Sequence, residues 1–197
     1  VYEIPEGSKV SKGRAIQNII NLPKEDKVMA YINTKDLKDE EYINSHYIMM
    51  CTKKGVVKKT SLEAYSRPRT NGINAITIRE GDQLLEAKMT TGNSHVMMAV
   101  KSGKAIHFEE EKVRSMGRTA SGVRGIRLAD ENDEVVGMIC IEDQESTVLV
   151  VAENGYGKRS AVEDYRITNR GGKGVKTINV TEKTGKLLSL IHISEPT

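Results

Sequence analysis

The stretch TVLVVAENGYGKRSAVEDY, residues 147–165, decides the fold, because its pattern occurs twice earlier in the chain. Residues 47–65 read YIMMCTKKGVVKKTSLEAY, and residues 95–113 read HVMMAVKSGKAIHFEEEKV. Each copy has an apolar run, a glycine at the same place and a second run that carries cations. The shared glycines are Gly55, Gly103 and Gly155. A residue without a side chain tolerates the positive φ of a tight hairpin turn, so each copy predicts a β-hairpin.

After each hairpin the three copies continue alike. A basic loop follows, with the sequences SRPRT (66–70), RSMGRT (114–119) and RITNRGGK (166–173). Next come a glycine and alternating apolar residues, in NGINAITI (71–78), SGVRGIRL (121–128) and KGVKTINV (173–180). A closing apolar segment ends each copy, in DQLLEAKMT (82–90), DEVVGMICI (133–141) and GKLLSL (185–190). Alternation with a period of two is typical of half-buried strands, so each copy predicts four strands.

A period of about 50 residues with four short strands per unit favours a blade of a propeller-like array. The chain is expected to be all-β, with about three four-stranded blades plus part of a fourth. The predicted units are 1–46 (the end of an upstream blade and a linker), 47–94, 95–146 and 147–187, the last of them incomplete. Within the first unit, 11–22 and 26–34 are expected to supply a basic loop with a strand and a closing strand, and the polar stretch 33–46 a surface loop.

Capping-box patterns predict a single helical turn between the second and third strands of a unit. They are Thr60-x-x-Glu63 and Ser160-x-x-Glu163, and the second repeat lacks an equivalent.

Composition sets limits on the function. Apolar residues make up 38% and charged residues 29%, which is typical of a globular protein rather than a disordered one. Aromatic residues make up 4% with no Trp, so a base-stacking platform for single strands is disfavoured. Cys51 and Cys140 lie far apart among apolar neighbours and are expected to be reduced, buried thiols. No apolar run approaches the roughly 20 residues that span a bilayer, so no membrane partner is expected.

No catalytic motif is found. The chain has no HExxH, nucleophile elbow, EF-hand or Walker A sequence, and its four histidines are isolated from one another in the sequence. NRGGKG (169–174) lacks the spacing of a nucleotide-binding P-loop. We therefore expect no catalytic residues, no metal site and no cofactor in this chain.

Positive charge recurs at equivalent positions of the copies. The net charge of +3 is modest, so a nucleic-acid role depends on where cations cluster. In an array of similar blades, equivalent positions share one rim, so the cations form a curved stripe suited to the phosphate backbone of a bent duplex. The glycines of NRGGKG let backbone N–H groups approach phosphates. The candidate DNA-binding residues are Lys58, Lys59, Arg67, Arg69, Arg114, Arg118, Arg124, Lys158, Arg159, Arg166, Arg170, Gly171, Gly172, Lys173 and Gly174.

A second interpretation stays open. Repeat proteins place Lys and Arg on exposed edges to block strand pairing, and this alone accounts for about half of these cations. On that interpretation the chain is a propeller-like scaffold for protein interactions.

With these motifs in place, the sequence resembles the C-terminal domain of the DNA gyrase A protein, a type IIA DNA topoisomerase. The resemblance rests on NGYGKRSAVEDY, SMGRTASGVRGIRL, GVVKKTSLEAYSRPRTNG and NRGGKG, and it extends over residues 1–187. It implies a β-pinwheel whose blades exchange strands with their neighbours and whose basic rim wraps duplex DNA. It also implies a bacterial cytoplasmic, nucleoid-associated protein that works with the rest of gyrase A and with the ATPase protein gyrase B, where ATP and Mg²⁺ are used. The equivalent domain of topoisomerase IV is the nearest alternative within this resemblance.

One loop departs from the family pattern. The signature loop of gyrase is commonly Gln-Arg-Arg-Gly-Gly-Lys-Gly, whereas this chain has Thr168 and Asn169 before the shared Arg170–Gly174 segment. It also lies in a later repeat than the signature loop. NRGGKG is therefore expected to be a secondary wrapping loop.

Both ends of the chain carry an expectation. The chain opens at VYEIPEG without Met, so we expect a fragment. LSLIHISEPT (188–197) fits the repeat poorly and resembles a translated sequencing adapter, so residues 188–197 are expected to be non-native and outside the fold.

Overall fold

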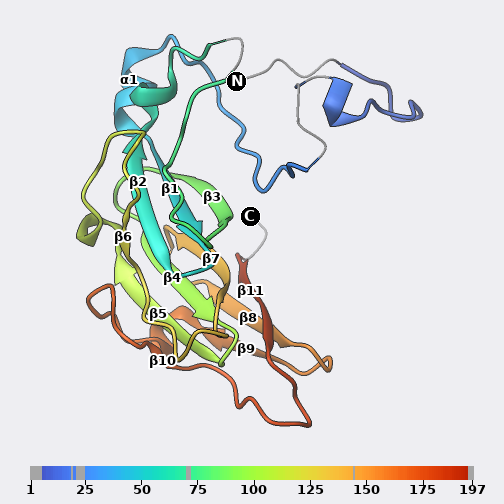
Figure 1. Cartoon of the computed structure of the whole chain (residues 1–197), viewed down its shortest axis with the longest axis vertical. Coiled ribbons are helices and arrows are strands. Elements are labelled where there is room, and N and C mark those ends of the chain that lie inside the picture. The colour runs from blue at the N-terminus through green and yellow to red at the C-terminus, as the bar shows by residue number, and fades with distance from the viewer. Residues whose placement is uncertain (1–5, 19, 21–24, 70–71, 144, 195–197) are drawn as a thin grey trace.

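The protein is a stack of antiparallel sheets, shown in Figure 1 as a computed structural model that describes residues 6–18, 20, 25–69, 72–143 and 145–194. Three sheets follow one another along the long axis, and the N-terminal segment extends away from them. Helix among the described residues is limited to one short α-helix and four 3₁₀ turns. The predicted all-β, propeller-like fold is confirmed.

Each sheet is one blade. In strand order, the first contains β3 (Leu84–Thr90), β1 (Tyr47–Thr52), β2 (Val56–Ser61) and β6 (Val123–Arg124). The second contains β10 (Val175–Lys176), β5 (Lys104–Glu109), β4 (His95–Val100) and β7 (Val135–Ile141). The third contains β11 (Leu187–Ile193), β8 (Thr147–Ala152) and β9 (Gly157–Ala161). The hairpin glycines Gly55, Gly103 and Gly155 have φ of 81°, 82° and 82°, as predicted.

The fourth strand of a sheet comes from the following repeat. β6 belongs to the second repeat and pairs with β2 of the first, so that Val57 lies opposite Val123. β10 belongs to the third repeat and pairs with β5 of the second, so that Ala105 lies opposite Val175. This exchange of strands between neighbouring blades agrees with the expectation drawn from the resemblance. Consecutive repeats are joined by exchanged strands, because the basic loop carries the chain across the outside of the preceding blade.

The apolar runs of the first and second blades have both faces buried because each of these two blades lies between two cores. In β4, Val96 and Met98 pack into the core shared with the first blade, while Met97 and Ala99 pack into the core shared with the third. The side chains of neighbouring strand residues point to opposite faces, so a strand buried on both faces needs a continuous apolar run. A third core covers the outer face of the first blade.

A 3₁₀ turn follows the second strand of every blade. These turns are η2 (Leu62–Tyr65), η3 (Glu110–Lys112) and η4 (Val162–Asp164). The predicted helical turn is thus present even in the repeat without a capping box, but the capping residues were wrong. Ser61, not Thr60, caps η2 by accepting a hydrogen bond from the Glu63 N–H, and η4 has no side-chain cap.

The N-terminal region differs from the strands expected for it. Residues 28–34 alternate between half-buried and exposed but form no strand, and the described part of 11–22 holds one 3₁₀ turn, η1 (Ile16–Asn18). Within the polar stretch 33–46 the structure has one helix, α1 (Glu40–Ser45). The Asp39 side chain caps the N-terminus of this helix by accepting a hydrogen bond from the Tyr42 N–H. The alternating segment of the first repeat also forms no strand in its described part. A strand needs an adjacent edge for its N–H and C=O groups, and no described strand offers one there.

The C-terminal segment is part of the fold through residue 193. β11 pairs with β8 from Leu187 opposite Ala152 to Ile193 opposite Thr147. Leu190 is 6% exposed and belongs to the core between the second and third blades. The expectation that residues from 188 onward lie outside the fold was therefore wrong, because this segment pairs with β8 and buries Leu190 in the core. Residues 195–197 lie outside the described residues, and the proposed origin of the tail stays a prediction.

Candidate nucleic-acid interface

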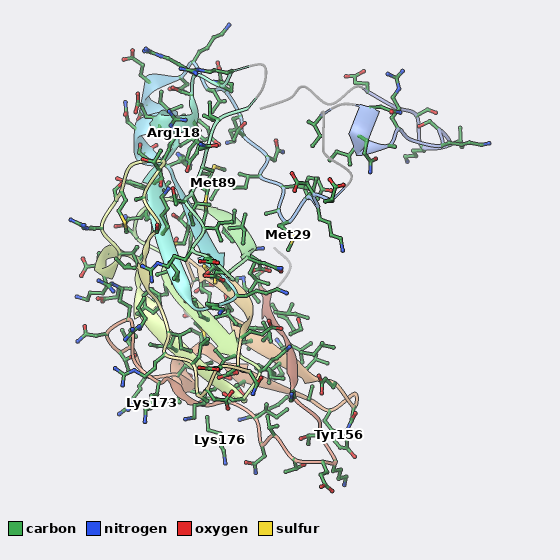
Figure 2. All side chains as sticks on the ribbon, viewed as in Figure 1. Met29, Met89, Arg118, Tyr156, Lys173 and Lys176 are labelled. Atoms are coloured by element: carbon green, nitrogen blue, oxygen red, sulfur yellow. The ribbon has the colours of Figure 1, made fainter. Side chains whose placement is uncertain are left out.

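The exchanged strands and the basic loops share one side of the stack. β6 and β10 lie along the same edge in Figure 1, and the labelled Arg118, Lys173 and Lys176 lie on that side in Figure 2. The loops of the second and third repeats are each fixed to strand two of the preceding blade by an equivalent backbone bond. Met116 N–H donates to Lys59 C=O at 2.8 Å, and Thr168 N–H donates to His107 C=O at 2.8 Å. The loops therefore recur at the same place on consecutive blades, which is the geometry of a rim.

The candidate cations fall into three groups by exposure. The exposed ones are Arg67, Arg69, Arg114, Arg124, Lys158, Arg159, Arg166 and Lys173. Arg127 and Lys176 on the third-strand segments are exposed as well. Arg118 and Arg170 are half-buried, and Lys58 and Lys59 are buried. Most of the predicted cations thus face solvent, and the prediction that Lys58 and Lys59 lie on the rim was wrong.

Lys58 is buried because the next repeat covers it. Its side chain is fully buried, and its Nζ donates to the carbonyl oxygens of Ala75 and Arg118. Burial lowers the pKa of Lys58 to about 8, and the nearby Arg118 acts in the same direction. The lysines of this strand predict an exposed position in the sequence. In the structure the basic loop of the following repeat packs over the strand and buries them.

Lys59 belongs to a buried polar cluster at the junction of the first two blades. Its Nζ lies 3.7 Å from Glu110 Oε1 and 5.0 Å from the centre of the Tyr47 ring. Glu110 is itself fully buried, and its carboxylate accepts from Thr90 Oγ1 at 2.7 Å and from Ser94 N–H at 3.1 Å. The charge of Lys59 is therefore compensated inside the protein.

The NRGGKG loop is bound to the second repeat through its backbone. Gly171 N–H donates to Gly125 C=O at 2.6 Å, and Arg127 N–H donates to Gly172 C=O at 2.8 Å. At Gly174, where φ is 72°, an added Cβ would lie 2.4 Å from the carbonyl oxygen of Ala105. Glycine is therefore required there for β10 to reach β5.

A cavity of about 270 Å³ opens beside this loop. Its lining combines two exposed cations, Arg166 and Lys173, with Thr168 and the backbone of Gly172 and Gly174. Cations and glycine backbone around a shallow hollow form a suitable cradle for a phosphate group.

Lys158 and Arg159 are exposed for a reason that follows from strand exchange. They occupy the positions that Lys58 and Lys59 hold in the first blade. No described strand pairs with the outer edge of β9, whereas β2 is covered by β6 and the loop before it. Their exposure therefore depends on whether a further third strand covers β9.

Acidic residues flank the basic edge at the ends of the blades. The turn before β7 carries Asp133 and Glu134. Asp133 accepts hydrogen bonds from the backbone N–H and the hydroxyl of Ser102. Glu134 forms salt bridges with Lys53 and Lys101. At the other end, η3 and η4 contribute Glu111, Glu163 and Asp164, all exposed.

Within the residues that the structure describes, His, Cys, Asp and Glu side chains form no group of three that could hold a metal ion. Cys51 and Cys140 are free thiols, and burial raises the pKa of both, to about 12 for Cys140. None of the described helices has the length and apolarity needed to cross a bilayer.

Sequence reasoning missed two structural groups. Glu110 takes the place of Leu62 and Val162 of the other repeats, and only alignment of the η turns reveals a carboxylate at a core position. His107 is isolated in the sequence, but its Nε2 lies 3.0 Å from Nδ1 of His95 across the hairpin. Its Nδ1 is hydrogen-bonded to the carbonyl oxygen of Tyr165 at 2.7 Å. Both lie between blades, so their partners are distant in the sequence.

Blades that exchange strands and present cations on one outer edge define a propeller-like repeat domain with a basic rim. A family model described as "DNA gyrase C-terminal domain, beta-propeller" matches residues 1–35, 46–90, 94–142 and 146–194. The chain belongs to this family, which confirms the resemblance drawn from its motifs.

Two curated relatives and two solved structures support this assignment. The DNA gyrase A proteins of Staphylococcus epidermidis (strain ATCC 12228 / FDA PCI 1200) and Staphylococcus aureus (strain NCTC 8325 / PS 47) are 43% and 41% identical over 194 residues. The match covers 98% of this chain and 21% of either relative, so the chain spans about a fifth of their length.

A solved DNA gyrase A C-terminal domain has a TM-score of 0.77 and 26% identity, covering 94% of this chain and 60% of that one. The C-terminal domain of DNA topoisomerase IV has a TM-score of 0.82 and 23% identity, covering 92% and 55%, and its likeness shows the fold alone.

Proposed function

We propose that this chain is a DNA-binding and DNA-wrapping module of a DNA gyrase A protein. The observation that carries the proposal is the recurrence of exposed cations at equivalent rim positions, held by equivalent backbone bonds. Arg114 and Arg166 start consecutive loops, and Arg124 and Lys176 lie on consecutive exchanged strands. A rim of this kind contacts the phosphates of a duplex without reading its bases.

Bending follows from the stacking of blades. Because successive blades of a propeller are arranged around a common axis, equivalent cations are expected along a curved edge, and a duplex that contacts all of them must bend. The added phosphate contacts offset the elastic cost of the bend, which is on the order of several kcal/mol for a sharply bent site. In the whole gyrase A protein this bending would support ATP-dependent negative supercoiling.

The partners follow from the same assignment. Duplex DNA, the remainder of gyrase A and the ATPase protein gyrase B are the proposed partners, in the cytoplasm and at the nucleoid of a bacterium. ATP and Mg²⁺ would be used elsewhere in the holoenzyme, and we place no cofactor and no catalytic residue in this chain. The 43% identity to a DNA gyrase A protein favours gyrase over topoisomerase IV.

The test compares two variants that each lose three positive charges. The rim variant is Arg124→Gln/Lys173→Gln/Lys176→Gln. The control is Lys35→Gln/Lys183→Gln/Lys186→Gln, whose lysines are exposed and belong neither to the basic loops nor to β6 and β10. Duplex affinity is measured over a range of salt, and the bend by energy transfer between labelled DNA ends. Each lost phosphate contact reduces the slope of log K against log salt by about 0.9, so the rim variant is expected to lose about 2 to 3 units of slope and most of the bend.

The control is expected to retain the slope and the bend of the unmodified chain. Equal losses in both variants would show that only total charge matters, and the wrapping proposal would be rejected. A scaffold for protein interactions, the second interpretation of the cations, predicts no salt-dependent duplex binding and a stoichiometric protein partner.

A further inference from the structure

Two of the candidate cations, Lys58 and Arg170, each donate side-chain hydrogen bonds to backbone carbonyl oxygens of two different segments of the protein. We propose that Lys58 and Arg170 are positioning residues, each of which holds a basic loop at the spacing that DNA wrapping requires. The proposal rests on the proposed function, but its structural half concerns the free protein. It separates these two residues from Lys173 and Lys176, which are exposed and make no hydrogen bond or ion pair with any described residue.

Lys58 binds the basic loop of the second repeat to strand β2 of the first repeat. It lies on β2 of the first repeat, and its ammonium group bridges two carbonyl oxygens. One belongs to Ala75, in the segment that follows the first basic loop, and the other belongs to Arg118, in the second basic loop. Because the side chain is fully buried, it cannot contact DNA without unfolding this junction. Its effect on the rim therefore passes through the position of the Arg118 backbone.

Arg170 binds the basic loop of the third repeat to the second repeat. It lies in the third repeat, and its guanidinium reaches back to two carbonyls of the second. Nε donates to Lys112 C=O at 2.8 Å, and Nη1 donates to Arg124 C=O at 3.1 Å. Lys112 shortly precedes the second basic loop, and Arg124 lies in β6, which follows that loop. A planar guanidinium can bridge two fixed acceptors, and an ammonium on a flexible stem cannot replace it at both.

The two residues connect the three repeats through consecutive contacts to backbone carbonyls. Lys58 fixes the second loop to the first blade, and Arg170 fixes the third loop to both ends of the second. The phosphates of one DNA strand recur about every 3.4 Å along the axis, so a rim that contacts several of them needs fixed distances between its loops. The hydrogen bonds of the buried Lys58 and the half-buried Arg170 fix the distances between loops. The exposed cations contact the phosphates.

Positioning and contact differ in two observables. A residue that neutralises a phosphate contributes about 0.9 to the salt slope, whereas a residue bonded to protein carbonyls contributes none. A residue that fixes a loop protects its backbone amides from hydrogen exchange in the free protein, whereas an exposed lysine does not. The Met116, Arg127 and Thr168 amides report on the two loops.

The experiment uses the full chain with Lys58→Met, Arg170→Gln and Arg170→Lys, and with Lys173→Gln as the matched contact variant. Lys58→Met and both Arg170 variants are expected to speed exchange of the loop amides at least tenfold. At fixed salt they should weaken duplex binding about fivefold to tenfold, reduce the bend and leave the salt slope unchanged. Lys173→Gln is expected to lower the slope by about 0.9 and to leave exchange unchanged. Arg170→Lys keeps the charge, so its failure to restore protection isolates the two-carbonyl bridge.

Other outcomes decide against the proposal. A lower salt slope with unchanged exchange in Arg170→Gln would make Arg170 a DNA contact and overturn its assignment. Unchanged exchange in Lys58→Met would overturn the assignment of Lys58. If Lys58→Met does not fold, the Arg170 pair still decides, since Arg170 is only half-buried. If the unmodified chain shows no salt-dependent duplex binding, the proposed function fails, and the exchange data still decide whether these residues fix the loops.

Discussion

At the scale of single residues, the main finding is that equivalent cations have different roles. Lys58 and Lys158 occupy the same place in the repeat, yet one is fully buried and the other exposed. The difference arises because an exchanged strand and its loop cover β2, and no described strand covers β9. A charge in a repeat is therefore assigned to DNA or to the protein by its neighbours, not by its position in the repeat.

The buried ammonium of Lys58 predicts a pH dependence of stability. Its pKa is about 8 in the folded chain and near 10.5 when unfolded, so the unfolded state binds more protons between these values. Stability attributable to this group is therefore complete above pH 10.5 and is lost as the pH falls through 8. Relative to Lys58→Met, the unmodified chain is expected to gain on the order of 1 kcal/mol in unfolding free energy from about pH 8 to about pH 10.

Urea unfolding of both proteins across this range measures the difference, in which the titration of other groups cancels. A difference that stays constant, or falls as the pH rises, would show that Lys58 keeps an ordinary pKa in the folded chain.

Glu110 and Lys59 predict a coupled pair of mutational effects. Glu110→Leu installs the residue found at the same position in the first repeat but leaves the Lys59 ammonium buried without its carboxylate. We expect a loss of about 3 to 5 kcal/mol, because an uncompensated buried charge is costly. Lys59→Met/Glu110→Leu should recover at least half of it, since apolar side chains can replace a buried ion pair. Urea unfolding of the four proteins gives the coupling, and additive losses would contradict it.

At the scale of elements, the exchanged strand depends on a glycine at its start. Gly122 and Gly174 precede β6 and β10, have φ of 95° and 72°, and lie against the backbone of strand two of the preceding blade. Loop and strand are therefore one unit: the glycine turns the chain onto the neighbouring blade, and the basic loop follows the path that this turn sets.

Two glycine variants separate this close approach from backbone strain. Gly174→Ala adds a Cβ that would lie 2.4 Å from the Ala105 carbonyl oxygen, while Gly155→Ala meets nothing within 4 Å at φ of 82°. Gly155→Ala is expected to cost about 1 kcal/mol, the penalty of a left-handed residue. Gly174→Ala is expected to cost about 3 kcal/mol or more, because β10 must also move away from β5. Equal costs in denaturant unfolding would mean that the close approach relaxes freely.

At the scale of the whole molecule, strand exchange makes each blade depend on the next. The second and third blades share a core and also β10, which is a strand of one sheet and a segment of the other repeat. In arrays whose repeats only stack, neighbours are coupled through surfaces alone. Here the chain itself crosses each boundary, so the rim and the stability of the stack have one structural cause.

This coupling predicts cooperative opening. In native-state hydrogen exchange with added urea, amides of β4, β5 and β8 are expected to open in one transition with a common dependence on denaturant. In Gly174→Ala that transition should move to lower urea for β4 and β5 as well as for β8. Opening of β8 alone, with β4 and β5 unaffected, would show that the blades are independent units.

Much of the fold could be predicted because it is local. The hairpin glycines, the apolar runs of the hairpins and closing segments, and the repeat period depend on residues near one another in the chain. The 3₁₀ turns of the first and third repeats were predicted, although with the wrong capping residues, and the second repeat has the same turn because the path from strand two into the loop requires it. The exposed arginines of the candidate site, such as Arg114 and Arg166, were predicted for the same reason: their loops have the same local form in both repeats.

The sequence by itself determined the number of hairpins, the period and the side of the repeat that carries positive charge, because turn chemistry and alternation are properties of neighbouring residues. Only the tertiary structure decided which strand of a repeat pairs with the preceding blade, that the closing strand of the third sheet extends to Ile193, and that Lys58, Lys59 and Arg170 bond to the protein. These outcomes depend on which backbone groups meet across a blade boundary. A buried lysine and an exposed lysine are identical in the sequence. Whether another segment of the chain packs over the side chain decides which of the two it becomes.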